Sequence, residues 1–237
     1  MRVCILGNGL SSLALSKALV NQNIYVDLIT KKKQNRPDQL RTIGISKSNL
    51  DFFNNQIINI EKISWKLKKI EIFTDNLKKE KLLNFENHNE ELFSIVKNFQ
   101  LMDVLEKALS KDVCFNKLQK KINSNLMKNY DLIINTDTSN FINKKYFNRR
   151  IVKVYNSSAY ATIIVHEKIK NDSATQIFTK NGPLAFLPLS NNQTSIVFSN
   201  NSIKLIDKVN FLKIINKYNN KYKIDKISEV ESFSIKF

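Results

Sequence analysis

The sequence predicts an α/β fold, α+β overall, with a parallel sheet in one part of the chain and an antiparallel sheet in another. Two patterns lead to this prediction. Residues 3–30 have the pattern of strand, glycine turn, helix and strand, and the later part of the chain has alternating apolar runs that end in turns. The length of 237 residues is sufficient for one large domain or two small domains with a core.

The N-terminal pattern is that of a βαβ unit. The continuous apolar run Val3–Leu6 is typical of a strand covered on both faces, and residues 24–30 form a second run that is rich in β-branched and aromatic side chains. Between them, apolar residues recur at helical spacing from Ser11 onward. We expect Ser11 or Ser12 to cap this helix. Together these elements predict a Rossmann-like domain.

Glycine is scarce, so its positions are informative. The chain has four glycines, and Gly7 and Gly9 both lie in the first turn. Gly7 permits a tight turn, and Gly9 allows the backbone to come close to a pyrophosphate. Ser12 stands where the pattern has a third small residue, which keeps helix and strand close together. The helix N-terminus would face the same anion, so the turn predicts a bound nucleotide, with a purely structural turn as the alternative.

The acidic residue that usually ends the second strand and binds a ribose is absent. Thr30 stands there, followed by Lys31–Lys33, while Asp27 comes earlier in the strand and is expected to face elsewhere. Thr30 would give a weaker hydrogen bond to the ribose. The lysines either receive a 2′-phosphate, as in NADP sites, or form a solvated loop.

The net charge of +17 does not by itself predict a nucleic-acid partner. The basic residues are mainly lysines, which are spread along the chain in twos and threes instead of forming one arginine-rich stripe. A weak attraction to anionic lipid is compatible with this charge. No apolar run is long enough to cross a membrane and no signal peptide is expected, so membrane contact would be peripheral.

Cysteine and histidine give no catalytic or metal-binding pattern. Cys4 lies in the first apolar run and is expected to be a small buried hydrophobe, and Cys114 is far from it. We therefore expect no metal site and a reducing cytoplasm as the compartment. His88 and His166 are expected to be surface or half-buried residues.

Strand patterns dominate the rest of the chain. Residues 69–75 and 80–85 are consistent with strands joined by a polar loop, and residues 160–169 alternate between apolar and polar positions. The stretch "PLAFLPL" at residues 183–189, the turn "SNNQ" and "TSIVFS" predict a hairpin with an apolar face. That face is either a wall for an apolar ligand or ordinary sheet core. Residues 198–237 are charged and polar, and no terminating helix is expected there.

Three segments, in this order along the chain, resemble one family of enzymes. They are "RTIGIS" at residues 41–46, "IVKNFQLMDVLEKAL" at residues 95–109 and "FTKNGPLAFLPLSNNQTSIVFS" at residues 178–199. The chain resembles the flavin-dependent aromatic-ring hydroxylases, in particular the ubiquinone-biosynthesis branch that acts on polyprenylated phenols.

This resemblance implies FAD as the cofactor, NAD(P)H as the electron donor and O2 as co-substrate, with no catalytic side chain required. It implies a discontinuous FAD-binding domain, residues 1–68 and 95–150, and a substrate domain, residues 69–94 and 151–237. Gly182 would let a planar ring approach the backbone and Pro183 would stiffen the next step, with a simple turn as the alternative. The implied cofactor-binding residues are Gly7, Gly9, Ser11, Ser12, Thr30, Arg41, Asn98 and Asp137, and the implied substrate-lining residues are Gly182, Pro183, Leu184, Phe186 and Pro188.

The sequence departs from the family pattern in two places. In "YDLIINTDTSN", residues 130–140, Asp137 is present but Thr138 replaces the glycine that follows it in the family. The second FAD signature, a Gly-Asp pair followed by His-Pro and a Gly-Gln-Gly turn, is absent, so the resemblance covers only the N-terminal part of the family and the C-terminal part is expected to be missing.

These departures leave several functions open. We expect first a truncated monooxygenase that acts on a polyprenylated phenol. Its expected partner is a ubiquinone-biosynthesis complex, and no nucleic-acid partner is expected. Its expected location is the cytoplasm, or the inner face of the membrane. One half of a split protein, a non-catalytic accessory protein or pseudo-enzyme of a quinone-synthesis complex, and an NADP-dependent Rossmann reductase are the alternatives.

Overall fold

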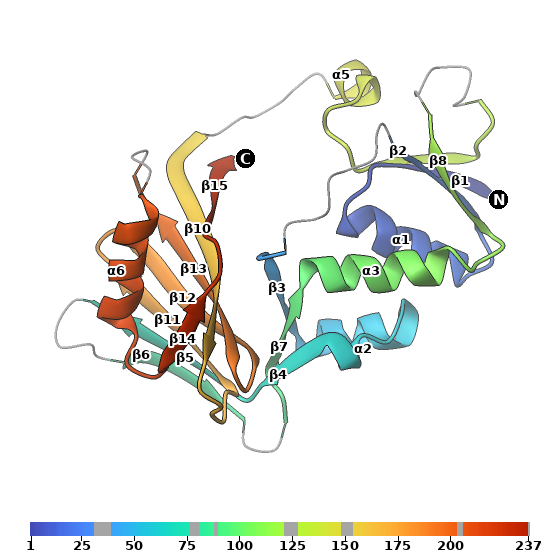
Figure 1. Cartoon of the computed structure of the whole chain (residues 1–237). Helices are drawn as coiled ribbons and strands as arrows, with labels where there is room; N and C mark the ends of the chain where they lie inside the picture. Colours follow the sequence, from blue (N-terminus) through green and yellow to red (C-terminus); the bar gives the residue numbers. More distant parts are fainter. Residues whose placement is uncertain are drawn as a thin grey trace. The chain divides into compact units, whose positions relative to one another are not determined.

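The computed structural model divides the chain into two compact units (Figure 1). Unit 1 comprises residues 1–39, 48–63 and 97–150, and unit 2 comprises residues 40–47, 64–96 and 151–237. The structure describes residues 1–30, 39–75, 81–87, 90–120, 128–147, 154–202 and 206–236.

Unit 1 is built on a parallel sheet with the strand order β8-β2-β1-β9. β1 lies inside this sheet, where Val3 pairs with Val26 on one side and with Leu132 on the other. Its side chains from Val3 to Leu6 are buried, as expected for a strand covered on both faces. The predicted βαβ unit and parallel sheet are therefore confirmed. The strands are β1 (Arg2–Leu6), β2 (Tyr25–Thr30), β8 (Phe115–Gln119) and β9 (Leu132–Asn135), and the helices are α1 (Leu10–Val20), α2 (Lys47–Gln56), α3 (Asn98–Leu109), α5 (Phe141–Tyr146) and the 3-10 helix η1 (Glu61–Ile63).

The start of α1 differs from the prediction. The residue at its N-cap is Gly9, and no side chain among the described residues caps the helix there. The prediction that Ser11 or Ser12 caps α1 was wrong, because the helix begins at Leu10 and both serines already lie within its first turn. Ser12 is buried, and this small side chain allows the helix to pack closely on the sheet.

Asp27, on β2, is the centre of a polar network in unit 1. It is 1% exposed and accepts hydrogen bonds from Arg2 Nη2 at 2.7 Å, Tyr130 Oη at 2.8 Å and Asn116 Nδ2 at 3.0 Å. Burial acts to raise the pKa of Asp27, but the hydrogen bonds from Asn116, Tyr130 and Arg2 together hold the pKa below its ordinary value. The carboxylate thus joins β1, β2, β8 and the segment before β9.

Cys4 lies close to this carboxylate and is 3% exposed. Burial, with a smaller contribution from the charge of Asp27, raises the pKa of the Cys4 thiol to about 12. The expectation of a small buried hydrophobe is confirmed.

Unit 2 is built on an eight-stranded sheet with the order β14-β10-β13-β12-β11-β5-β6, in which β15 also pairs with β10. The pairings are antiparallel except for β5 and β11, which are parallel. The predicted hairpin is confirmed, since Leu184 pairs with Phe198 and Ser190 with Gln193. The strands are β5 (Lys69–Thr74), β6 (Lys81–Glu86), β10 (Val154–His166), β11 (Ser173–Thr179), β12 (Gly182–Ser190), β13 (Gln193–Asn200), β14 (Ile224–Ile227) and β15 (Glu231–Lys236).

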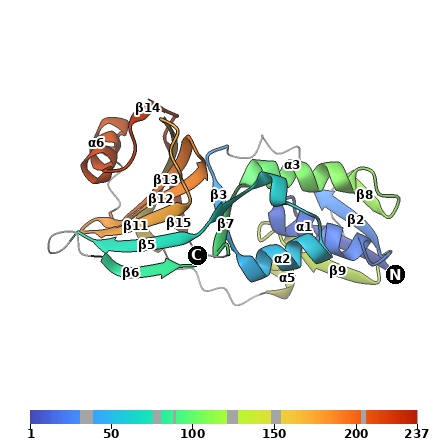
Figure 2. The same ribbon diagram turned by 90° about the horizontal axis from the view of Figure 1, so that it is seen from below.

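The helix α6 (Lys208–Tyr218) covers one face of this sheet (Figure 2). Phe211, Ile215 and Tyr218, spaced by four and three residues, pack into the core, and Asp207 caps the helix by accepting from the N–H of Asn210. The expectation of no helix in residues 198–237 was wrong, because this narrow apolar stripe is interleaved with lysines and asparagines that mask it in the sequence.

A smaller sheet of β3 (Thr42–Ser46), β7 (Phe93–Lys97) and β4 (Ser64–Leu67) also belongs to unit 2. Trp65 Nε1 donates to the carbonyl of Asn171 at 2.7 Å, which ties β4 to the segment before β11. Unit 2 also includes residues 40–47, 64–68 and 95–96, which the resemblance implied to be part of the FAD-binding domain.

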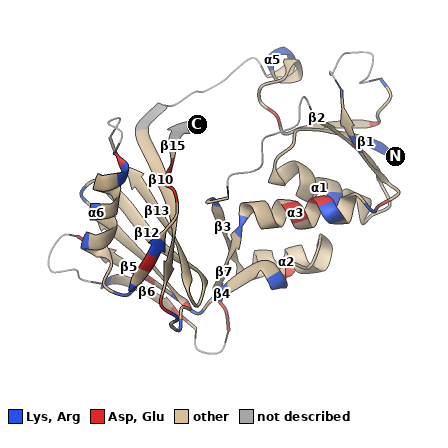
Figure 3. Ribbon diagram, in the orientation of Figure 1, with Lys and Arg blue, Asp and Glu red and all other residues tan. Residues whose placement is uncertain are grey.

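Among the described residues, no helix is long and apolar enough to cross a membrane. Figure 3 shows that Lys and Arg residues are distributed over elements of both units, with Asp and Glu residues among them.

We expect Asp27→Asn to lower the free energy of unfolding at pH 7 by about 2 to 3 kcal/mol, because the charged acceptor of hydrogen bonds from Arg2, Asn116 and Tyr130 is lost. The folded-state pKa of Asp27 is lowered, so its stabilising contribution is complete above the ordinary aspartate pKa of about 3.9 and is lost as the pH falls through the lowered value. The difference between wild type and variant should therefore shrink below about pH 4. Urea unfolding from pH 7 to pH 2.5 measures it, with the exposed Asp103→Asn as the control; a difference independent of pH would contradict the prediction.

Candidate functional site

A small polar cluster lies where the carboxyl ends of β1 and β9 meet the start of α1. Thr136, directly after β9, donates from its backbone N–H and from its Oγ1 to the carbonyl of Leu6, at 2.8 and 2.9 Å. The hydroxyls of Ser12 and Thr136 share a hydrogen bond of 2.7 Å. These bonds fix the spacing between the two strands and the first turn of the helix.

Gly7 is required by this packing. Its φ is +143°, a backbone conformation that other residues rarely adopt. A Cβ on Gly7 would lie 2.0 Å from Oγ1 of Thr136 and 2.7 Å from the hydroxyl of Ser12. The structural role is therefore sufficient to explain this glycine.

Gly9 is different, because neither its backbone nor its neighbours require glycine. Its φ of −93° and ψ of 179° are ordinary extended values, and apart from its chain neighbours no atom of the described residues lies within 4 Å of the position that a Cβ would take. The first turn of α1 has no acidic residue and its N-cap has no side-chain hydrogen bond within the described part of the chain, so no carboxylate of that turn neutralises the positive end of the helix dipole. Such an arrangement suits a phosphate group that comes close to the backbone.

Thr30 and Asn98 lie toward the same edge of the unit 1 sheet. Thr30 is the last residue of β2 and is buried. Asn98 is the first residue of α3, which leads into the amino end of β8 and therefore begins toward the carboxyl edge. Its Oδ1 is buried and has no hydrogen-bond partner within the described parts of the chain. A buried acceptor of this kind is costly unless a donor reaches it, so Asn98 fits a ligand that carries one.

Asp137 lies in the turn that follows β9. Its Oδ1 accepts from the backbone N–H of Ser139 at 2.8 Å and from the Ser139 hydroxyl at 2.7 Å. The turn is further closed by Asn140, which donates to Asn135 Oδ1 at 2.6 Å. Asp137 thus shapes the loop beside Thr136, and its contact with a cofactor stays a prediction.

Arg41 belongs to unit 2, where its guanidinium lies 4.2 Å from the ring centroid of Phe233. The structure thus places the expected cofactor residues in two groups. Those that unit 1 brings to one edge of its sheet are Gly7, Gly9, Ser11, Ser12, Thr30, Asn98 and Asp137. The role of Arg41 stays a prediction.

The expected substrate-lining residues are divided between the two faces of β12. Leu184 and Phe186, 0% and 3% exposed, belong to the core beneath α6. Pro183 is half-buried and has the opposite orientation in the strand, and Pro188 is buried. Gly182 has a φ of +126°, and a Cβ there would lie 1.9 Å from the carbonyl oxygen of Ser199. Sheet packing is sufficient to explain Leu184, Phe186 and Gly182, and substrate contact stays a prediction for all five.

Sequence reasoning missed the role of Thr136. The available signal was a hydroxyl residue placed directly after the apolar run of β9, where parallel strands present their carboxyl ends. His166 is also more buried than expected, at 2% exposed, because its ring lies 4.5 Å from that of Tyr222 and its Nε2 is 2.9 Å from the Thr194 hydroxyl. Lys31–Lys33 and His88 lie outside the described residues.

No protein-family model matches the chain, and no curated protein matches it in sequence. Solved structures match its fold. PqsL, a probable FAD-dependent monooxygenase from Pseudomonas aeruginosa, has a TM-score of 0.65 at 10% identity, over 84% of this chain and 60% of PqsL. A variant of Klebsiella pneumoniae HpxO complexed with FAD has a TM-score of 0.70 at 10% identity, over 100% of this chain and 69% of HpxO. A geranylgeranyl bacteriochlorophyll reductase-like protein from Thermoplasma acidophilum has a TM-score of 0.69 at 11% identity, over 98% of this chain and 66% of that protein.

These similarities establish the fold, and the predicted fold class is confirmed. The chain spans 60% of the length of PqsL.

We expect Gly7→Ala and Gly9→Ala to have opposite consequences for stability. Gly7→Ala should lower the free energy of unfolding by at least about 2 kcal/mol, because it combines an unfavourable φ with a clash against Thr136. Gly9→Ala should change it by less than about 1 kcal/mol, since alanine is only a poorer N-cap there. Urea unfolding of both variants beside the wild type measures the contrast. Equal destabilisation by the two substitutions would show that Gly9 is also held by packing.

Proposed function

We propose that the glycine turn of unit 1 binds FAD and that the chain acts as a flavin-dependent monooxygenase. The observation that carries this proposal is the open surface at Gly9, beside a Gly7 that packing alone explains. The FAD in the HpxO structure and the description of PqsL as a probable monooxygenase support it.

The residues of unit 1 suggest how the cofactor would be held. The N–H groups at the start of α1 would bind the pyrophosphate, and Gly9 would let it approach. Thr30 would offer a hydroxyl toward the ribose in place of the usual carboxylate. Asn98 would supply the buried Oδ1 as an acceptor for a donor group of the cofactor. When bound and reduced by NAD(P)H, FAD would supply the chemistry that transfers one oxygen atom from O2 to an electron-rich ring.

We further propose an aromatic ring of a polyprenylated phenol as the substrate. The resemblance of residues 41–46, 95–109 and 178–199 to the ubiquinone-biosynthesis branch, whose members include 2-polyprenyl-6-methoxyphenol hydroxylase, supports this class. PqsL has been solved in complex with 2-aminobenzoylacetate, which contains an aromatic ring. The Thermoplasma acidophilum protein is described as geranylgeranyl bacteriochlorophyll reductase-like, a name that refers to a prenylated pigment. A prenylated substrate would be held in a membrane, and the net charge of +17 would favour contact with an anionic surface.

We expect the 237-residue chain to bind FAD, and Gly9→Val to weaken this binding at least tenfold, because the added side chain fills the surface that the pyrophosphate would occupy. Quenching of flavin fluorescence measures the affinity. The control is Ser110→Val, which adds the same side chain at an exposed position at the far end of α3. Equal affinity of Gly9→Val and wild type, with both folded, would reject the site.

The substrate class is tested separately by incubating the FAD-loaded chain with a short-chain prenylated phenol, NADH or NADPH, and oxygen. We expect a product that carries one added oxygen atom, detected by mass spectrometry. FAD binding without any such product would favour the accessory protein. Binding of NADPH in preference to both FAD and NADH would favour the reductase.

A further inference from the structure

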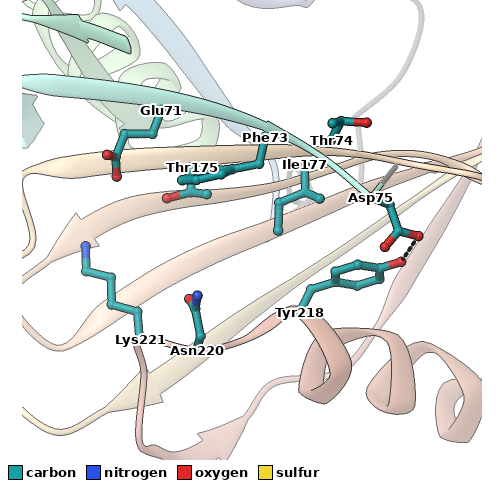
Figure 4. A pocket seen from close by; sticks show the side chains of 9 residues that line it. All are labelled: Glu71, Phe73, Thr74, Asp75, Thr175, Ile177, Tyr218, Asn220 and Lys221. Carbon is teal, nitrogen blue, oxygen red and sulfur yellow. Dashed lines mark hydrogen bonds between the residues drawn. The ribbon is translucent and has the colours of Figure 1, made fainter. Parts of the chain in front are cut away.

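Unit 2 contains a pocket of about 220 Å³ beneath the C-terminal end of α6 (Figure 4). Its floor is the parallel pair of β5 and β11, and its wall is the end of α6 with the segment that follows it. All of its lining residues belong to unit 2, and none is among the residues expected to hold FAD.

The floor of this pocket is apolar at its centre. Phe73 of β5 and Ile177 of β11 are direct neighbours in the register of the two strands, so their side chains lie side by side on one face. The ring of Tyr218 closes the opposite side (Figure 4). A flat apolar group would therefore find contact on two sides.

The two acidic groups of the pocket already have donors. Glu71 accepts from Lys81 at 2.6 Å and lies 3.2 Å from Lys69. Asp75 accepts from the Tyr218 hydroxyl at 2.6 Å. Burial and the bond to Asp75 raise the pKa of Tyr218, so the phenol keeps its proton and remains the donor at neutral pH.

Lys221 is in a different position. Its Nζ lies 3.3 Å from Asn171 Oδ1 and 3.5 Å from the carbonyl of Ser173, so within the described residues its hydrogen-bond acceptors are two neutral oxygens at long distance. Lys221 is an exposed residue at the rim of the pocket; partial desolvation lowers its pKa, and the charges of Asp172 and Glu71 raise it. An ammonium held this way gains from a negatively charged acceptor that enters the pocket.

We propose that this pocket binds a small planar carboxylic acid, with its ring between Phe73, Ile177 and Tyr218 and its carboxylate on Lys221. The volume agrees with such a ligand, since an apolar protein cavity of about 150 Å³ accepts benzene and this pocket is larger. The site is separate from the glycine turn, so it can be tested without FAD.

The test is calorimetric titration of the 237-residue chain with 2-naphthoate, and with 2-naphthol as the neutral analogue of similar shape. Naphthoate should bind saturably and at least tenfold more tightly than naphthol. Lys221→Gln should remove most of this preference. Lys223→Gln makes the same change of charge two residues away, at an exposed lysine paired with Glu167, and should bind naphthoate as the wild type does.

Asn220→Trp provides a second variant that keeps Lys221 but places a large side chain at the exposed rim of the pocket. It should reduce naphthoate binding at least tenfold while circular dichroism shows an unchanged fold. The proposal is overturned if the wild type shows no saturable binding, if naphthol binds as tightly as naphthoate, or if Lys223→Gln loses as much affinity as Lys221→Gln.

Discussion

The structure of unit 1 depends on the close approach of three chain segments at the carboxyl end of β1. Thr136 bonds twice to the carbonyl of Leu6 and once to the hydroxyl of Ser12. The space that remains admits only a glycine at position 7. Because interiors are packed as densely as crystals, the turn after β1, the first turn of α1 and the end of β9 must form together.

This constraint assigns different roles to two neighbouring glycines. Gly7 closes the turn and Gly9 leaves the helix N-terminus open to an anion. Within β2 of the same sheet, Asp27 is surrounded by donors, so its charge is satisfied within the protein. The polar groups of unit 1 are thus separated into a closed structural network and an open edge, and chemistry at the ends of parallel strands requires such an open edge.

Unit 2 shows a comparable separation. The side chains of Leu184 and Phe186, on the face of β12 that packs against α6, are buried in the core. The pocket lies where α6 ends, and Tyr218 and Lys221 line it together with residues of β5 and β11. The ligand site that we propose in unit 2 is therefore placed by the end of the covering helix.

The sequence by itself determined the βαβ unit, the parallel and antiparallel sheets and the hairpin of β12 and β13, because these depend on local periodicity and on scarce glycines. It also located Gly7 and Gly9 in the first turn, although α1 begins at Leu10 and not after a serine cap. Only the tertiary structure decided that Gly7 is held by Thr136, that Leu184 and Phe186 are core, and that β3 and β4 group with unit 2. The tertiary structure likewise determined the pocket at Lys221, because its lining residues are far apart in the chain. Contacts between such distant residues leave no pattern in a single sequence.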